Sequence, residues 1–261
     1  MIKKYIKRIF NYLGLNIEKY NKEFVNLSFD KIILNILEEN PIIFDVGANE
    51  GQSISKYLKI FNKPTIHAFE PLNDQFDKLE SQYNSYKNII LNNFALGDKE
   101  EMKKFYKAKK SSTSSFNKFN LNSEWIKLRS KQNNTSIENF AEKIDDVKIS
   151  TLDNYCINNK INTIDLLKID TQGYEDKVLE GAKDMIQNNK INIIICEIMF
   201  DDSYEKYFNF SDIEKYLINN DFRMVGIDLI NNSLFSGVVF FADVMYINKK
   251  NYDIGKINIV K

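Results

Sequence analysis

Short apolar runs alternate with longer segments of helical periodicity along most of the chain after residue 41. This alternation is typical of parallel strands that are joined by crossover helices on both faces of one sheet. We therefore predict an open, mainly parallel α/β sheet. The apolar runs predict strands at 42–46, 65–70, 89–95, 165–170 and 192–198, and the periodic segments predict helices near 52–60, 72–83 and 174–187.

Two further apolar runs follow each other late in the chain. They read "FRMVGIDLI" at 222–230 and "VVFFADVMYIN" at 238–248, with only a short polar turn between them. Neighbouring strands with so short a connection pair antiparallel. We expect a hairpin at the far end of the sheet.

The first forty residues are interpreted as a helical extension of a single domain that covers 41–261. The first helix has an apolar stripe and a basic opposite face, and it packs on the domain or on a second subunit, as in a homodimer, or else contacts an anionic membrane surface. A second helix, apolar over 29–37, ends at Asn40 because Pro41 follows. The stripe consists of Ile2, Tyr5, Ile6, Ile9, Phe10 and Leu13, and the basic face of Lys3, Lys4, Lys7 and Arg8.

A polar stretch at about 107–147 separates the third predicted strand from the fourth. It is rich in serine and asparagine and holds "SSTSSF" and the only tryptophan, Trp125. Long connections inside compact domains are usually functional lids or disordered segments. We interpret this stretch as an insertion that covers a binding site, in which Trp125 stacks on a ligand or anchors the lid.

Composition excludes several classes of protein. The 36 basic and 36 acidic side chains leave no net charge, so no nucleic-acid partner is expected. The two cysteines, Cys156 and Cys196, have no ligand spacing and are expected to be reduced thiols. No apolar run approaches the ~20 residues of a membrane helix, and no signal-peptide pattern is seen. We therefore expect a cytoplasmic protein without a transmembrane segment.

The first predicted strand runs into an acidic glycine turn, "FDVGANEG" at 44–51. A dinucleotide fingerprint has three glycines, whose turn leaves amides free for a pyrophosphate. Here only Gly47 and Gly51 are present, and Asp45 precedes them. An acid this close repels phosphate and attracts a cation. Glu70, at the end of the next strand, suits two ribose hydroxyls, so the pair favours a cationic nucleoside.

Five segments follow one another along the chain: "FDVGANEGQS", "HAFEPLNDQFDKL", "NFALGD", "SSTSSF" and "STLDNYCINNKINTIDLLKIDTQGYEDKVLEGA". Together they resemble the FkbM-type S-adenosylmethionine-dependent methyltransferases. The resemblance covers roughly residues 42–198, and it implies the class I methyltransferase fold, a Rossmann-like sheet of seven strands with the last antiparallel. It also implies methylation of hydroxyl groups, commonly on sugars of glycans or on secondary metabolites.

The resemblance also implies which residues bind the cofactor. The glycine turn lines its methionine end, Glu70 and Pro71 lie at the ribose, and the end of the third strand contacts the adenine. Serines of the "SSTSSF" segment become ordered around substrate or cofactor, or are simply part of a solvated loop. The implied residues are Asp45, Gly47, Asn49 and Gly51 for the turn, Asn93, Ala95 and Asp98 for the adenine, and Ser114 and Ser115 for the segment.

Carboxylates at the ends of the later strands are the candidates for the chemistry. Asp170 and Glu197 end the fourth and fifth predicted strands, where either one serves as general base or shapes the site. Lys168 lies on the same strand face as Asp170, as a catalytic or an ion-pairing residue. Glu175 is a third acidic candidate. Gln172 departs from the family, in which many members carry Glu at this position.

Three alternatives remain open from the sequence. Asp201 and Asp202 would join the two strand-end acids if a hard cation were bound, but we assign no residue to a metal. An NAD-dependent oxidoreductase shares the layered sheet and the ribose acid. A nucleoside-binding module without activity is the third alternative. The favoured interpretation is an O-methyltransferase that acts on a saccharide hydroxyl in a glycan, nucleotide-sugar or capsular polysaccharide pathway.

Overall fold

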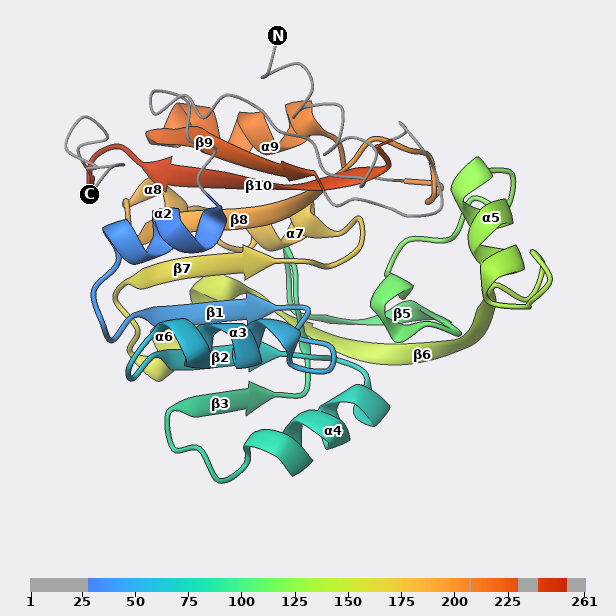
Figure 1. Ribbon diagram of the computed structural model, residues 1–261, viewed down its shortest axis with the longest axis horizontal. Coiled ribbons are helices and arrows are strands. Elements are labelled where there is room, and N and C mark those ends of the chain that lie inside the picture. The colour runs from blue at the N-terminus through green and yellow to red at the C-terminus, as the bar shows by residue number, and fades with distance from the viewer. Residues whose placement is uncertain (1–27, 207, 230–238, 253–261) are drawn as a thin grey trace, which may run out of the picture.

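The computed structural model describes residues 28–206, 208–229 and 239–252, and its centre is a seven-stranded sheet (Figure 1). The strand order is β3-β2-β1-β7-β8-β10-β9. The strands are β1 (Ile42–Val46), β2 (Thr65–Phe69), β3 (Ile89–Asn92), β7 (Ile164–Ile169), β8 (Ile191–Met199), β9 (Phe222–Leu229) and β10 (Phe241–Asn248).

The directions of the strands match the expected mainly parallel sheet. The neighbours from β3 to β8 all pair parallel, and β10 pairs antiparallel with both β8 and β9, which confirms the terminal hairpin. The chain fills the sheet outward from β1 in one direction and then from β7 in the other. The border between β1 and β7 is therefore the switch point, where open α/β sheets bind their ligands.

Helices cover both faces of this sheet because its strands are apolar on both sides. On one face, α2 (Phe29–Ile36), α3 (Gln52–Ile60) and α4 (Asn73–Tyr83) share a buried cluster with residues such as Ile43 and Ile193. On the other face, α6 (Leu152–Asn159), α7 (Glu175–Glu180), α8 (Lys183–Gln187) and α9 (Phe210–Leu217) pack around Phe44 and Ile194. None of the described helices is long and apolar enough to cross a membrane.

The polar stretch at 107–147 is more ordered than its sequence predicts. β5 (Glu101–Ala108) and β6 (Ala141–Ser150) form a long antiparallel pair, which β4 (Ala95–Leu96) completes as a small second sheet. Between them lie the 3₁₀ turn η1 (Ser111–Thr113) and α5 (Glu124–Gln132). In Figure 1 this arm extends sideways from the main sheet and ends in α5.

Other differences have local causes. The predicted strand at 89–95 is split, since Asn93 donates its side-chain amide to the Glu70 carbonyl oxygen and the chain turns into β4. The predicted helix at 174–187 is divided near Gly181, where a Cβ would lie 1.9 Å from the carbonyl oxygen of Gly97. The second predicted helix ends at Ile36, before Asn40. The first predicted helix lies outside the described residues.

Candidate functional site

A cavity of about 360 Å³ opens at the carboxyl edge of the main sheet, over the switch point. The ends of β1, β2, β7 and β8 form its floor, and η1, α5 and β5 form its cover. Its wall comprises residues 46–49, 52–53, 69–72, 95–96, 110–114 and 170–172 together with Phe105, Phe116, Trp125, Arg129, Lys168, Glu197 and Phe241.

The glycine turn after β1 holds the backbone close to the end of β7. A Cβ on Gly47, whose φ is +86°, would lie 2.0 Å from the carbonyl oxygen of Asp170, so only glycine fits there. Asn49 also has a left-handed φ, of +47°, and its Oδ1 accepts a 2.9 Å hydrogen bond from the Ser111 hydroxyl. Gly51 does not line the cavity. It faces α4 instead, where a Cβ would meet the ring of Tyr83.

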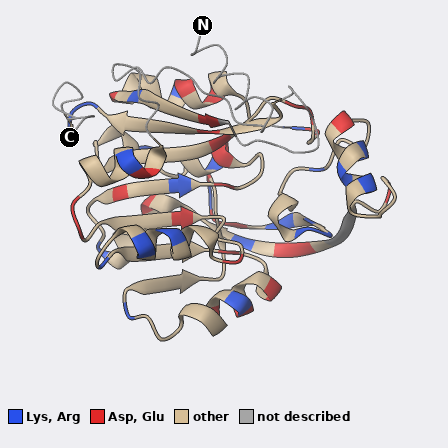
Figure 2. Ribbon diagram, in the orientation of Figure 1, with Lys and Arg blue, Asp and Glu red and all other residues tan. Residues whose placement is uncertain are grey.

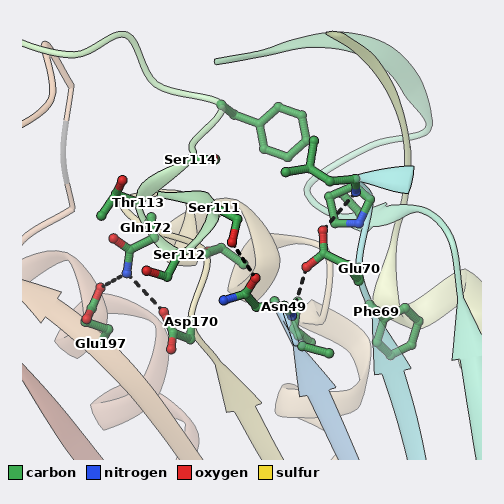
Figure 3. Close-up of a pocket in the computed structure, with 18 of the residues that line it drawn as sticks. Asn49, Phe69, Glu70, Ser111, Ser112, Thr113, Ser114, Asp170, Gln172 and Glu197 are labelled. Atoms are coloured by element: carbon green, nitrogen blue, oxygen red, sulfur yellow. Dashed lines mark hydrogen bonds between the residues drawn. The ribbon is translucent and has the colours of Figure 1, made fainter. Parts of the chain in front are cut away.

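Glu70 binds the loops that follow β1 and β2, at the β2 end of the cavity. Its Oε2 accepts a 2.9 Å hydrogen bond from the Asn49 amide, and its Oε1 accepts one of 2.8 Å from the Leu72 amide (Figure 3). Burial raises the pKa of Glu70 to about 7, although these two hydrogen bonds oppose the shift. A carboxylate has about four acceptor positions, so each oxygen retains one for a ligand hydroxyl. Pro71 follows on the same wall.

Asp45 lies beneath the cavity and contacts it through Lys168. The Asp45 side chain is fully buried, neither of its oxygens accepts a hydrogen bond from the described residues, and Lys168 Nζ is 3.7 Å from Oδ1. Burial raises the pKa of Asp45. Burial also opposes the charge on Lys168, but Asp170 and Asp45 outweigh it and raise the pKa of the lysine. Lys168 thus carries a stable positive charge between two acids.

The strand-end acids Asp170 and Glu197 meet at one side chain. Gln172 Nε2 donates to Asp170 Oδ1 at 3.1 Å and to Glu197 Oε2 at 2.7 Å (Figure 3). Lys168 Nζ holds the other oxygen of Asp170 at 3.1 Å. Burial, together with the nearby acids, raises the pKa of Glu197 well above its ordinary value. Glu197 is thus held by an amide in a buried setting, whereas Asp170 is fixed by a lysine and the same amide.

Glu175 is buried away from the cavity and stabilises the loop that carries Gln172. Its oxygens accept hydrogen bonds from the Thr171 amide at 2.8 Å and from the Gly173 amide at 2.9 Å. Burial raises the pKa of Glu175 to about 7 against these bonds. Because Glu175 is absent from the cavity wall, we leave it out of the catalytic set that we propose below.

The remaining predicted residues divide between the cavity and its supports. Ala95 and Ser114 lie on the wall, and the Ser114 hydroxyl accepts from the Ala108 amide at 3.1 Å. Ser115 lies behind it and donates to the Gln172 carbonyl oxygen at 2.6 Å. Asn93 stabilises the β2 loop as described above. Asp98 lies off the wall, with Lys177 Nζ 4.0 Å from its Oδ2.

Several wall residues were not predicted from the sequence. Ser111, Ser112 and Thr113 come from the same segment as the predicted serines, so its neighbouring positions could have been included. Phe69 and Phe105 add apolar side chains to the wall. Lys110 and Arg129 on the wall come from the arm. Sequence periodicity contains no signal for Arg129, because its place depends on how α5 folds back over the sheet.

Three further side chains, one histidine and two acids, are held in structural contacts. His67 Nδ1 is 2.8 Å from the Tyr155 hydroxyl, and burial lowers the pKa of the histidine to about 4. Asp201 accepts from the Ser203 hydroxyl at 2.6 Å, and Asp202 from Asn120 Nδ2 at 3.0 Å. Within the described part of the chain, no three acidic, histidine or cysteine side chains converge as metal ligands.

The cavity fits a nucleoside that carries positive charge. Its volume lies in the range of small-molecule sites. The wall near β2 combines the Glu70 carboxylate with the apolar side chains of Phe69, Leu72 and Leu96, as a ribose and a base require. The three cations on the wall come from β7 and the arm, so the β1 and β2 loops present no positive side chain to a pyrophosphate. These residues fit S-adenosylmethionine.

Comparison with known proteins agrees with this chemistry. A protein named 2-O-methyltransferase NoeI, from Sinorhizobium fredii (strain NBRC 101917 / NGR234), is 23% identical over 194 residues, which are 72% of this chain and 76% of the relative. Aeropyrum pernix fibrillarin, solved with natively bound S-adenosyl-L-methionine, matches with a TM-score of 0.44 and 11% identity over 82% of this chain and 68% of its own.

An rRNA methylase from Streptococcus thermophilus also matches, with a TM-score of 0.44 and 11% identity, over 87% of this chain and 99% of its own. Both scores are below 0.5, and the assignment does not depend on them. A model of the methyltransferase FkbM domain matches residues 45–224, which is more than half of the chain. The chain therefore belongs to the FkbM methyltransferase family and is an S-adenosylmethionine-dependent methyltransferase.

Proposed function

We propose that this methyltransferase transfers the methyl group to a hydroxyl oxygen of a saccharide. The observation that carries the proposal is Asp170, a half-exposed carboxylate that lies on the cavity wall and is fixed by two neighbours. A relative that is named a 2-O-methyltransferase supports oxygen as the acceptor atom.

Asp170 is the general base in this proposal. A sugar hydroxyl is a weak nucleophile, so a base that removes its proton during transfer accelerates the reaction. Lys168 and Gln172 each hold one oxygen of Asp170, which fixes the direction of the carboxylate. When bound, S-adenosylmethionine supplies a methyl group on a sulfonium centre. The role of the protein is then to hold the acceptor oxygen in line with that group.

Glu197 binds the acceptor without accepting its proton. Burial raises the pKa of its carboxyl and Gln172 holds its Oε2, so in this proposal it orients a neighbouring hydroxyl by hydrogen bonding. Ser112 and Thr113 lie on the same wall, and Trp125 adds an aromatic surface. Polar groups beside an aromatic side chain are typical of saccharide sites. This combination is the support for a sugar acceptor.

Asp170→Asn tests the assignment of the base. The amide keeps the size of the side chain but takes no proton, so kcat should fall about 10²- to 10⁴-fold. Methyl transfer from radiolabelled cofactor to a panel of saccharides gives the rate, and NMR of the product locates the methyl group on oxygen. The affinity for S-adenosylhomocysteine, measured by calorimetry, should stay within about twofold, because in this proposal Asp170 contacts the acceptor and not the cofactor.

The matched control is Asp77→Asn on α4, an exposed residue away from the cavity, which should keep full activity. A rate for Asp170→Asn within about threefold of wild type would remove Asp170 as base. Methylation on nitrogen or carbon in the product would remove the O-methyltransferase assignment.

A further inference from the structure

The acceptor end of the cavity lies far from Glu70. In the sheet order, β1 and β7 separate β2 from β8, so the two strand ends are roughly 14 Å apart at the usual spacing of ~4.8 Å. At the far end the wall consists of Glu197, Phe241 at the start of β10, and side chains of α5. Trp125 of α5 shares a buried cluster with Met199 of β8. This contact fixes α5 over the acceptor end.

Two cations from the arm line this cavity, and neither has an acidic partner. Lys110 precedes η1, and Arg129 lies one turn after Trp125 on α5. No Asp or Glu among the described residues forms an ion pair with either side chain, whereas Lys168 at the centre of the same cavity pairs with two acids. Figure 2 shows basic positions along α5, at the end of the arm.

Arg129 and Trp125 form a unit with unused hydrogen-bond donors. The guanidinium carbon of Arg129 is 5.3 Å from the centre of the Trp125 ring, and Nη1 donates to Gln132 Oε1 at 2.7 Å. Arg129 Nε and Trp125 Nε1 are both buried, without a hydrogen-bond acceptor in the described part of the chain. Trp125 itself is only 2% exposed. Such donors require an acceptor, and a guanidinium matches the planar or trigonal oxygens of an oxyanion.

The acids at this end do not oppose an anion there. Gln172 Nε2 donates to Glu197 Oε2 at 2.7 Å, and burial raises the pKa of this carboxyl above its ordinary value. Asp170 is paired with Lys168 and hydrogen-bonded by Gln172. Among the described residues, the cations of the cavity wall that have no acidic partner are therefore Arg129 and Lys110.

We propose that this end of the cavity binds an oxyanion carried by the acceptor, either a carboxylate or a phosphate, through Arg129 with Lys110 and the Trp125 indole N–H. The inference rests on the proposed saccharide function and makes it more specific. The acceptor is then an acidic sugar, such as a uronic acid or a sugar phosphate, and its negative group fixes which hydroxyl faces Asp170.

Acceptors with and without an anionic group test this inference by turnover. Glucuronate and glucose 1-phosphate are compared with methyl glucoside, and the galacto series is measured in the same way. The charged member should have a kcat/KM at least about tenfold higher. Preference for the carboxylate or for the phosphate distinguishes the two sources of the oxyanion. Equal turnover of charged and neutral members would overturn the inference.

The Arg129→Gln variant tests whether Arg129 binds the oxyanion. It should raise KM for the charged acceptor about 10- to 100-fold, with kcat within about twofold and with the neutral acceptor unaffected. Arg129→Lys should restore part of the affinity because it keeps the charge. Arg223→Gln, at an exposed position on β9, is the matched control and should behave as wild type. An unchanged preference in Arg129→Gln would overturn the assignment.

Equilibrium binding separates this inference from the proposed function. Full-length protein saturated with S-adenosylhomocysteine is titrated calorimetrically with glucuronate, glucose 1-phosphate and glucose. The two anions should bind at least tenfold more tightly than glucose, and Arg129→Gln should abolish the difference. If the anions bind in this way but no sugar is methylated, the oxyanion site stands and the saccharide function fails. If the anions bind no more tightly than glucose, the oxyanion site fails.

Discussion

Gln172 connects the two carboxyl groups of the site through one amide nitrogen. The residue has a left-handed φ of +56°, a backbone conformation that residues other than glycine rarely adopt. The Ser115 hydroxyl holds its carbonyl oxygen, and the Tyr204 hydroxyl lies 3.4 Å from its Oε1. These contacts direct the amide N–H groups toward Asp170 and Glu197. The carboxamide thus reduces the repulsion that two adjacent acids would otherwise have.

Replacement of Gln172 by Met tests this role. Met has a similar length but no donor, so the Asp170 and Glu197 carboxyl groups lose the hydrogen bonds that hold them together. We expect kcat to fall about tenfold, in line with the ~1.5–3 kcal/mol of a hydrogen bond to a charged group. The affinity for S-adenosylhomocysteine should stay within about twofold. The measurements are kcat under saturating substrates and calorimetric binding of S-adenosylhomocysteine.

Gln82→Met, at an exposed position of α4, provides the control for the same chemical change. Its kcat should equal that of wild type. A Gln172→Met enzyme with the kcat of wild type would show that this bridge has no part in the reaction.

The close approach of β1 and β7 depends on Gly47. Its position leaves no room for a Cβ, and its φ is unfavourable for other residues. Gly47→Ala should lower the free energy of unfolding by about 2 kcal/mol or more, because backbone must move, and it should weaken S-adenosylhomocysteine binding at least tenfold. Urea unfolding and calorimetry measure the two effects.

Gly226→Ala on β9 is a useful comparison for this substitution. Its Cβ would meet the ring of Phe29 at 2.9 Å, which is a side chain and not backbone, and its φ is outside the left-handed region. We expect a smaller loss of stability there and unchanged cofactor affinity. If the two alanine variants bound cofactor equally well, the glycine turn would have no part in cofactor binding.

The elements of the main sheet were predictable because they are buried on both faces. The mainly apolar runs at β1, β2, β7 and β8 are typical of parallel strands that helices cover on both faces. The pair of β5 and β6 gave no such signal. Glu101, Lys103 and Lys104 occur within one strand, and in the described part of it only Phe105 and Ala108 are buried. The sequence of an exposed arm therefore resembles a polar loop.

The same distinction applies to the site. Acids at the ends of parallel strands must lie on one edge, so the gathering of Asp170, Glu197 and Glu70 followed from topology alone. The bridge made by Gln172 depends on a single backbone torsion, and the place of Arg129 depends on the arm. Neither feature produces a periodic pattern of apolar and polar residues in the sequence. The sequence thus predicted the floor of the cavity and a cover formed by the polar stretch at 107–147, but not the structure of that cover.

Considered as a whole, the molecule concentrates acids with raised pKa values at the carboxyl edge of its sheet. Burial raises the pKa of Glu70 and Glu175 to about 7 and that of Asp243 to about 6. The folded protein therefore holds protons that the unfolded chain releases from about pH 4 upward. Because the folded state binds more protons in this window, these groups reduce stability as the pH rises from about 4.5 to about 7.

Glu175→Gln isolates one of these contributions. A shift from 4.5 to about 7 corresponds to about 3 kcal/mol, and the amide variant does not titrate. Between pH 4.5 and 8, the free energy of unfolding of wild type should therefore fall by about 3 kcal/mol more than that of the variant. Urea unfolding followed by circular dichroism, at constant ionic strength, gives both curves. The amide loses the bond from Gly173, so the slope against pH is compared and not the absolute stability.

Glu80→Gln, at an exposed position of α4, is the control and should keep the wild-type slope. Parallel curves for wild type and Glu175→Gln would mean that Glu175 is already ionised in the folded protein.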